Sequence, residues 1–306
     1  MPRRRARALL KVTLAATATA VAASSVPAEL AGAQSLSVRV DGLDRGARPA
    51  FRSTTAVGTF VPGQPVRVEF VRDGAVVAAR QVGVQADGTF RARSPRLTAP
   101  GRYRVRAIAG PVVATSRPFR LRFPDLGRGD RGRAVEALHR ALRRMHFRAP
   151  KGARYTAATA RAVLAYRKVN WMAWTGRASS DVLSRVLRGR GAFKLRHPRA
   201  GRHVEVDLAR QVMALADGRE VRHVFHISSG APGTPSDRGH FRVYRRQPGY
   251  NRLGMLDSVY YNRGEAIHGY RSVPTYPASH GCVRSALADA RFIYGWVRLG
   301  MSIHVY

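Results

Sequence analysis

Short runs of alternating apolar and polar residues fill the chain after residue 35. The clearest lie at 66–71 and 103–108, and a period of two places successive side chains on opposite faces of a strand. Residue pairs that favour tight turns separate the runs. The spacing predicts that residues 35–123 form an all-β sandwich with an immunoglobulin-like arrangement. The turn pairs are Pro62-Gly63, Asp73-Gly74, Asp87-Gly88 and Pro100-Gly101.

Apolar residues recur at helical spacing after Pro124. They predict helices over 133–145, 156–167 and 179–187, which together make a small three-helix bundle within 124–188. Thr156 is expected to cap the second helix, because a threonine oxygen at that position accepts a hydrogen bond from a free backbone N–H. The third helix is expected to be capped by Ser179 or Ser180. The first helix presents the apolar residues Val135, Leu138, Leu142 and Met145 on one face.

The rest of the chain returns to strand-like alternation. Residues 189–201 are rich in glycine, arginine and proline and are expected to be a linker. An Asp-Gly pair at 217–218 predicts a hairpin between two of the following strands. We expect 202–306 to be a mostly β domain, so that the fold class is multidomain. Its strands are predicted at 203–208, 211–215, 221–228, 239–244, around 259–261 and at 302–306, with a helix at 285–297.

The first residues have the pattern of an export signal. Three arginines at 3–5 precede an alanine-rich apolar run at 9–23, and Ala31-Gly32-Ala33 supplies a cleavage site. Residues 1–33 are therefore expected to be removed, which leaves a secreted protein without a stable membrane span. Retention of the segment as a membrane anchor is the main alternative. No cysteine lies at 30–34, so the chain has no site for lipid attachment at its mature end.

The formal net charge is +36. Such a charge raises the question of nucleic-acid binding, since clustered cations supply most non-specific affinity for phosphates. Of the 54 basic residues, however, 50 are arginines spread over every segment, which indicates codon bias rather than a dedicated patch. We therefore expect no nucleic-acid partner. The charge predicts a salt-sensitive attraction to polyanionic polymers.

The candidate chemistry centres on the one cysteine of the chain, Cys282, with His268 fourteen positions upstream. A thiol becomes a strong nucleophile as a thiolate, and a nearby imidazole is the usual means of generating one. The alternative is a buried cysteine that acts as a small hydrophobic residue. The remaining histidines show no metal-ligand spacing, so no metal or other cofactor is expected. They are His139, His146, His197, His203, His223, His226, His240 and His304, with His280 beside the cysteine.

The segment 124–188 resembles the peptidoglycan-binding-like three-helix domain. The resemblance lies in the opening at 124–135, which includes Asp125-Leu126-Gly127 and Gly129-Asp130, and in the helix at 156–167. It implies that this domain contacts cell-wall glycan. The preceding sandwich contains no cysteine or histidine and is expected to be a spacer or a wall-contacting module. Trp171 and Trp174 depart from the family pattern. We expect buried tryptophans that close the bundle, with an exposed sugar-stacking platform as the alternative.

Residues 203–306 resemble the YkuD-type L,D-transpeptidase catalytic domain. The signature is Ile267-His268-Gly269, followed after a loop by Ser279-His280-Gly281-Cys282-Val283-Arg284. A second family element, Thr-Pro-x-Gly-x-Phe, has an altered form with inserted residues at 234–241. The last strand, at 302–306, is also similar to the family's closing strand.

The resemblance implies a role for each signature residue. Cys282 attacks a carbonyl of a peptidoglycan stem tetrapeptide and forms a thioester. His268 accepts the thiol proton and returns it to the departing D-alanine, while the Gly269 carbonyl fixes the imidazole tautomer. The backbone amides around Gly281 and Cys282 hold the tetrahedral oxyanion.

Four further residues have open roles. His280 either competes with His268 as the base or organises the loop. Arg284 either binds a substrate carboxylate or braces the loop. Ser279 either hydrogen-bonds locally or polarises His280. Tyr261 either lines the pocket or packs in the strand core, and the same choice applies to its neighbour Tyr260.

These features predict a secreted, cell-wall cysteine acyltransferase that forms 3-to-3 cross-links between stem peptides. The same thioester permits other acceptors: water, which makes the enzyme an L,D-carboxypeptidase, a protein, or a free D-amino acid. The alternative from another functional class is a wall-binding protein whose catalytic domain is inactive. The expected partners are stem peptides, glycan and anionic wall polymers.

Overall fold

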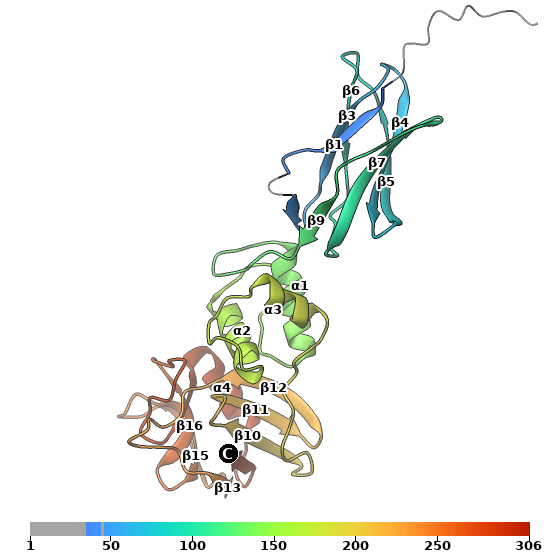
Figure 1. Cartoon of the computed structure of the whole chain (residues 1–306). Helices are drawn as coiled ribbons and strands as arrows, with labels where there is room; N and C mark the ends of the chain where they lie inside the picture. Colours follow the sequence, from blue (N-terminus) through green and yellow to red (C-terminus); the bar gives the residue numbers. More distant parts are fainter. Residues whose placement is uncertain (1–34, 44–45) are drawn as a thin grey trace, which may run out of the picture. The chain divides into compact units, whose positions relative to one another are not determined.

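The computed structural model describes residues 35–43 and 46–306 (Figure 1). The predicted export signal at 1–33 lies outside these residues. Within the described ranges, no helix combines the length and the apolar character that crossing a membrane requires.

The N-terminal part consists of two sheets with a common core. One sheet has the order β1-β3-β6 and the other β2-β9-β7-β4-β5, with β8 paired to β7. Phe90 and Ala56 of the first sheet meet Phe70 and Val105 of the second inside one apolar cluster. The immunoglobulin-like topology stays a prediction. The strands are β1 (Ser37–Val40), β2 (Ala47–Pro49), β3 (Thr55–Thr59), β4 (Pro65–Arg72), β5 (Ala75–Gly83), β6 (Thr89–Arg93), β7 (Gly101–Ala109), β8 (Val112–Thr115) and β9 (Phe119–Arg122).

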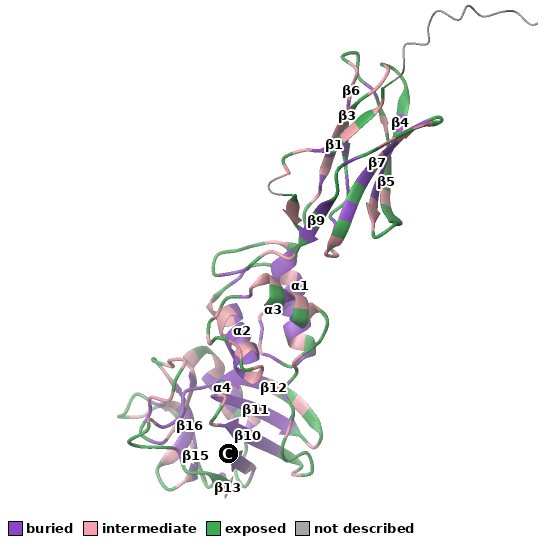
Figure 2. Ribbon diagram, viewed as in Figure 1, coloured by how far each residue is buried: buried purple, intermediate pink, exposed green. Residues whose placement is uncertain are grey.

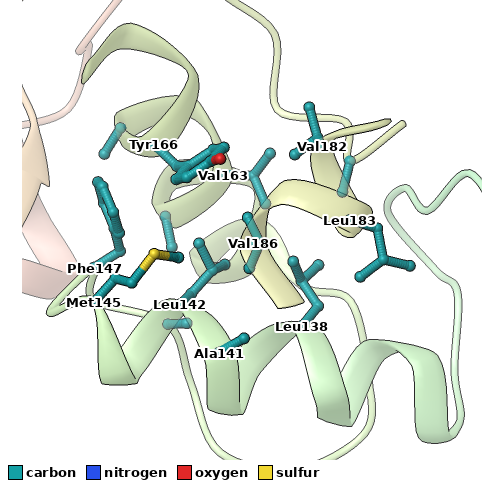
Figure 3. Close-up of a cluster of buried hydrophobic side chains, with 14 of the residues drawn as sticks. Leu138, Ala141, Leu142, Met145, Phe147, Val163, Tyr166, Val182, Leu183 and Val186 are labelled. Carbon is teal, nitrogen blue, oxygen red and sulfur yellow. The ribbon is translucent and has the colours of Figure 1, made fainter. Parts of the chain in front are cut away.

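The three predicted helices are present as α1 (Arg133–Arg144), α2 (Ala157–Val169) and α3 (Ser180–Leu187). Thr156 caps α2 by accepting a hydrogen bond from the Thr159 backbone N–H, and Ser179 caps α3 through Val182 in the same way. The apolar face of α1 meets the other two helices in one buried cluster (Figure 3). Fully burying one such side chain contributes roughly 1.5–3 kcal/mol. The peptidoglycan-binding identity of these helices stays a prediction.

The expectation of a buried tryptophan is wrong for Trp171. Its side chain is 62% exposed, and the guanidinium of Arg210 lies 4.7 Å from its ring centroid. The reason is that α2 ends at Val169, so Trp171, with a positive φ of 53°, lies beyond the helix that faces the bundle core. The bundle core is filled instead by Phe147 and Tyr166, whose rings meet edge to face.

Two sheets and a helix build the C-terminal domain, and buried residues concentrate where they face each other (Figure 2). A five-stranded sheet has the order β12-β11-β10-β18-β13, and a four-stranded sheet the order β14-β15-β16-β17. Helix α4 (Leu287–Trp296) packs against β15, β16 and β17. The strands are β10 (Arg202–Asp207), β11 (Val212–Asp217), β12 (Glu220–His226), β13 (Gly239–Arg242), β14 (Arg245–Tyr250), β15 (Leu256–Asn262), β16 (Glu265–Tyr270), β17 (Val283–Ala286) and β18 (Ser302–Val305).

A buried lysine joins α2 to the C-terminal domain. Lys168 Nζ hydrogen-bonds to the carbonyls of Gln211 and Ile227 and lies 2.9 Å from His226 Nδ1. Its burial lowers the pKa of Lys168 to about 7. His226 Nε2 in turn lies 3.2 Å from the carbonyl oxygen of Val273, in the segment that leads to Cys282. The helical domain thus contributes to the support of this segment.

Candidate active site

The two signature motifs lie on neighbouring parallel strands. β16 pairs with β17 so that Ile267 is opposite Val283 and His268 is opposite Arg284. Ile267 and Val283 point into the core, where both are buried. Because side chains alternate along a strand, His268 and Arg284 point to the other face. Cys282, immediately before β17, packs against the cluster of Met255, Tyr260 and Ala266, and Ala266 lies on this face two residues before His268. The fold therefore brings the candidate nucleophile and the candidate base to one face of two adjacent strands.

The imidazole of His268 is held in one tautomer. His268 is 3% exposed, and its Nδ1 lies 3.0 Å from the carbonyl oxygen of Gly269. A carbonyl can only accept, so the neutral ring carries its proton on Nδ1 and leaves the lone pair on Nε2. A side chain at Gly269 would place its Cβ 2.5 Å from Ala290 Cβ of α4. This close approach explains why a glycine supplies the orienting carbonyl.

Cys282 is half-buried, and its thiol lies 3.8 Å from the carbonyl oxygen of Gly264. Burial raises the pKa of the Cys282 thiol, and the negative charge of Glu265 acts in the same direction. Burial also lowers the pKa of His268 to about 4. No hydrogen bond joins these two groups. At neutral pH the resting site therefore holds a thiol and a neutral imidazole rather than an ion pair.

Hydroxyl groups bind the carbonyls of the loop before β17. Ser279 Oγ donates to the Cys282 carbonyl at 2.5 Å, and Ser236 Oγ donates to the Gly281 carbonyl at 2.5 Å. Thr234 Oγ1 donates to the Ser279 carbonyl at 2.9 Å. Fixing these carbonyls also fixes the peptide N–H groups on the opposite side. Thr234 and Ser236 belong to the altered second family element, so this segment holds the nucleophile loop in place.

The amides of Gly281 and Cys282 are free to bind a ligand. Among the described residues, neither N–H donates a hydrogen bond. Gly281 has a φ of 106°, which only glycine adopts without strain. Two adjacent free amides on a fixed loop are the usual components of an oxyanion site.

Replacing Gly281 by alanine is expected to lower the rate of Cys282 acylation about 10-fold or more, because one misplaced oxyanion donor costs at least this much. The new Cβ would lie 3.1 Å from Glu265 Oε1 and would carry an unfavourable φ. Stopped-flow acylation measures the effect. Gly233→Ala is the matched control, because its Cβ would meet nothing within 4 Å. Equal rates in the two variants would contradict an oxyanion role for this loop.

The other candidate residues lie around His268 and Cys282 in different environments. His280 is exposed and makes no hydrogen bond to any described residue. The guanidinium of Arg284 lies 4.3 Å from the ring centroid of Tyr270, whose ring meets the His268 imidazole edge to face. Tyr261 is 3% exposed and packs against Phe241 in the core. The protein thus encloses the imidazole on several sides, while the thiol keeps some solvent access.

The domain that contains these residues matches a known family. Residues 201–305 match the family described as the L,D-transpeptidase catalytic domain, YkuD. Residues 201–305 form a YkuD-type L,D-transpeptidase catalytic domain. The comparison with curated proteins gave no match.

Solved structures similar to the chain include other L,D-transpeptidases. One from Xylanimonas cellulosilytica is 28% identical, with a TM-score of 0.56, over 60% of this chain and 98% of that one. One from Stackebrandtia nassauensis is 19% identical over 60% and 96% of the two chains, with a TM-score of 0.39. One from Mycobacterium smegmatis is 12% identical over 88% and 99%, with a TM-score of 0.32. The Xylanimonas cellulosilytica structure matches 60% of this chain, which is a longer stretch than residues 201–305.

One group in the L,D-transpeptidase domain was not anticipated from the sequence. The carboxylate of Glu265, at the start of β16, lies against Gly281 and close to the Cys282 thiol. The exposed Asp237 donates its backbone N–H to Glu265 Oε1 at 2.9 Å. Two features of the sequence could have identified Glu265. It follows the Arg263-Gly264 turn directly, and it lies three residues before His268.

Proposed function

We propose that the protein is a secreted cysteine L,D-transpeptidase that acts on peptidoglycan stem tetrapeptides through a thioester on Cys282. The proposal is supported by the position of His268 on β16 and of Cys282 immediately before the paired strand β17, where it packs against the cluster that includes Ala266, within a matched L,D-transpeptidase domain.

Acylation begins with the thiol and the neutral imidazole. As Cys282 attacks the stem-peptide carbonyl, its proton moves to Nε2 of His268, the nitrogen that the Gly269 contact leaves unprotonated. The C–N bond to the terminal D-alanine then breaks, and the same proton passes to the departing amine. The amides of Gly281 and Cys282 stabilise the oxyanion between these two steps. The products are free D-alanine and a thioester.

Deacylation transfers the acyl group to the side-chain amine of a second stem peptide and completes a 3-to-3 cross-link. The neutral amine attacks the thioester carbonyl and gives its proton to His268. The C–S bond breaks, and the proton returns to sulfur, which restores the resting pair. No metal or cofactor takes part in either step.

The other parts of the chain are proposed to hold the enzyme at the wall. The exposed Trp171 of the helical domain offers an aromatic surface of the kind on which sugar rings stack. The net charge of +36 favours contact with anionic wall polymers.

Incubation of the protein with purified disaccharide tetrapeptides tests the proposal, with the products identified by mass. We expect cross-linked dimers together with released D-alanine. Monomeric tripeptide alone would identify an L,D-carboxypeptidase, and unchanged substrate would contradict the proposed activity.

A further inference from the structure

Two carboxylates lie beside the nucleophile of a strongly basic chain. Glu265 Oε1 accepts the Asp237 backbone N–H, and the Asn262 side-chain amide lies 3.5 Å from Glu265 Oε2 and 2.7 Å from Asp237 Oδ2. Asn262 thus joins the two acids. A side chain at position 281 would place its Cβ 3.1 Å from Glu265 Oε1, so this carboxylate lies directly against the nucleophile loop.

A buried hydroxyl with no partner points to the same place. Tyr261 is 3% exposed, and its hydroxyl lies near the Glu265 carboxylate without forming a hydrogen bond of normal geometry to any described residue. After burial itself, the charges of Glu265, Cys282 and Asp237 contribute to raising the pKa of this phenol. The hydroxyl therefore lies on the side of Tyr261 where Glu265 is found. A buried hydroxyl without a hydrogen-bond partner lowers the stability of a protein. Such a hydroxyl at a reactive centre therefore indicates a position where a bound ligand supplies the missing hydrogen bond.

The negative charge of Glu265 and Asp237 is unfavourable for acylation, the first half of the reaction. Negative charge near a thiol opposes thiolate formation. The acids are suited instead to a positively charged or hydrogen-donating partner. In the proposed reaction the acceptor is such a partner, because its side-chain amine arrives as an ammonium ion at neutral pH.

We propose that Glu265, assisted by Asp237 and the Tyr261 hydroxyl, binds the primary amine of the acceptor peptide and thereby selects an amine over water. This inference rests on the proposed function and concerns its second step alone. The ammonium ion docks on the Glu265 carboxylate and loses one proton to solvent. The neutral amine then attacks the Cys282 thioester, its remaining excess proton passes to His268, and the C–S bond breaks.

The variant Glu265→Gln tests this assignment, because glutamine has nearly the same shape and can still accept the Asp237 N–H. The protein is first acylated with a stem tetrapeptide, and a stem tripeptide with a free side-chain amine is then added. The readout is the ratio of cross-linked to hydrolysed product, together with the KM for the amine. Both products come from the same thioester. A general loss of structure would therefore reduce both products together, without lowering the ratio of cross-linked to hydrolysed product.

We expect Glu265→Gln to raise the acceptor KM and to lower the cross-link to hydrolysis ratio, each about 10-fold or more, as for a lost hydrogen bond to a charged group. Tyr261→Phe, which removes only the hydroxyl, should lower the ratio in the same direction. Glu220→Gln is the matched control, since the exposed Glu220 at the start of β12 forms an ion pair with Arg222. An unchanged ratio and KM in Glu265→Gln, with the thioester still forming, would overturn the inference. Failure of the unmodified protein to form a thioester would instead overturn the proposed function.

Discussion

Replacing Cys282 by alanine is expected to abolish covalent labelling by a carbapenem and all turnover of stem peptides. The chain has no other cysteine, so no second thiol can substitute. The side chain is half-buried at the end of a loop whose carbonyls are held by hydroxyl groups. The smaller alanine side chain therefore leaves the fold in place while it removes the nucleophile.

Intact-protein mass measurement after carbapenem treatment checks this prediction. The unmodified protein should gain the mass of one inhibitor molecule, and Cys282→Ala should gain none. Circular dichroism spectra that match between the two proteins control for folding. A mass gain in Cys282→Ala would place the reactive group elsewhere.

Replacing His268 by glutamine is expected to slow acylation by about 10²–10⁴-fold, the usual contribution of a general base. The resting thiol is protonated because burial raises its pKa, so it depends on a base to take the proton as attack begins. In the unmodified protein the acylation rate should fall as pH drops through about 4, where His268 becomes protonated. The variant should lack this acid limb.

Stopped-flow acylation from pH 3.5 to 8 measures both effects. His280→Gln is the comparison, because His280 is exposed and forms no hydrogen bond to a described residue. If His280 were the base, its replacement would cause the larger loss and would remove the acid limb. That outcome would contradict the assignment of His268.

Local sequence signals predicted much of the fold. Thr156 was expected to cap α2, and Ser179 or Ser180 to cap α3. Thr156 and Ser179 do so, because a cap depends on a few neighbouring residues. The Asp73-Gly74 turn lies between β4 and β5, with both residues at positive φ. Strands β14, β16 and β17 were not predicted. β17 has four residues and β16 has six, and so short a pattern does not distinguish a strand from a loop.

The candidate site was predictable in its residue types but not in its arrangement. The signature motifs identified His268 and Cys282, whereas their common face follows from the parallel pairing of β16 with β17, a contact between distant residues. Glu265 and Ser236 were missed for the same reason. Each lies against the nucleophile loop although it is distant from that loop in the sequence, and neither belongs to a local sequence pattern. Trp171 was expected to be buried, because tryptophans more often close a bundle than lie on its surface. It lies instead beyond the end of α2 at a positive φ, and its side chain is 62% exposed.

The proposed mechanism depends on a thioester between Cys282 and a stem peptide, with His268 as the base. Its most direct test is the intact mass of the protein, quenched in acid within seconds of mixing with a stem tetrapeptide. We predict that Cys282 gains the mass of the tetrapeptide minus the mass of D-alanine. This gain should be lost on treatment with hydroxylamine and should be far weaker in His268→Gln. An unmodified mass at every time, while products accumulate, would contradict it.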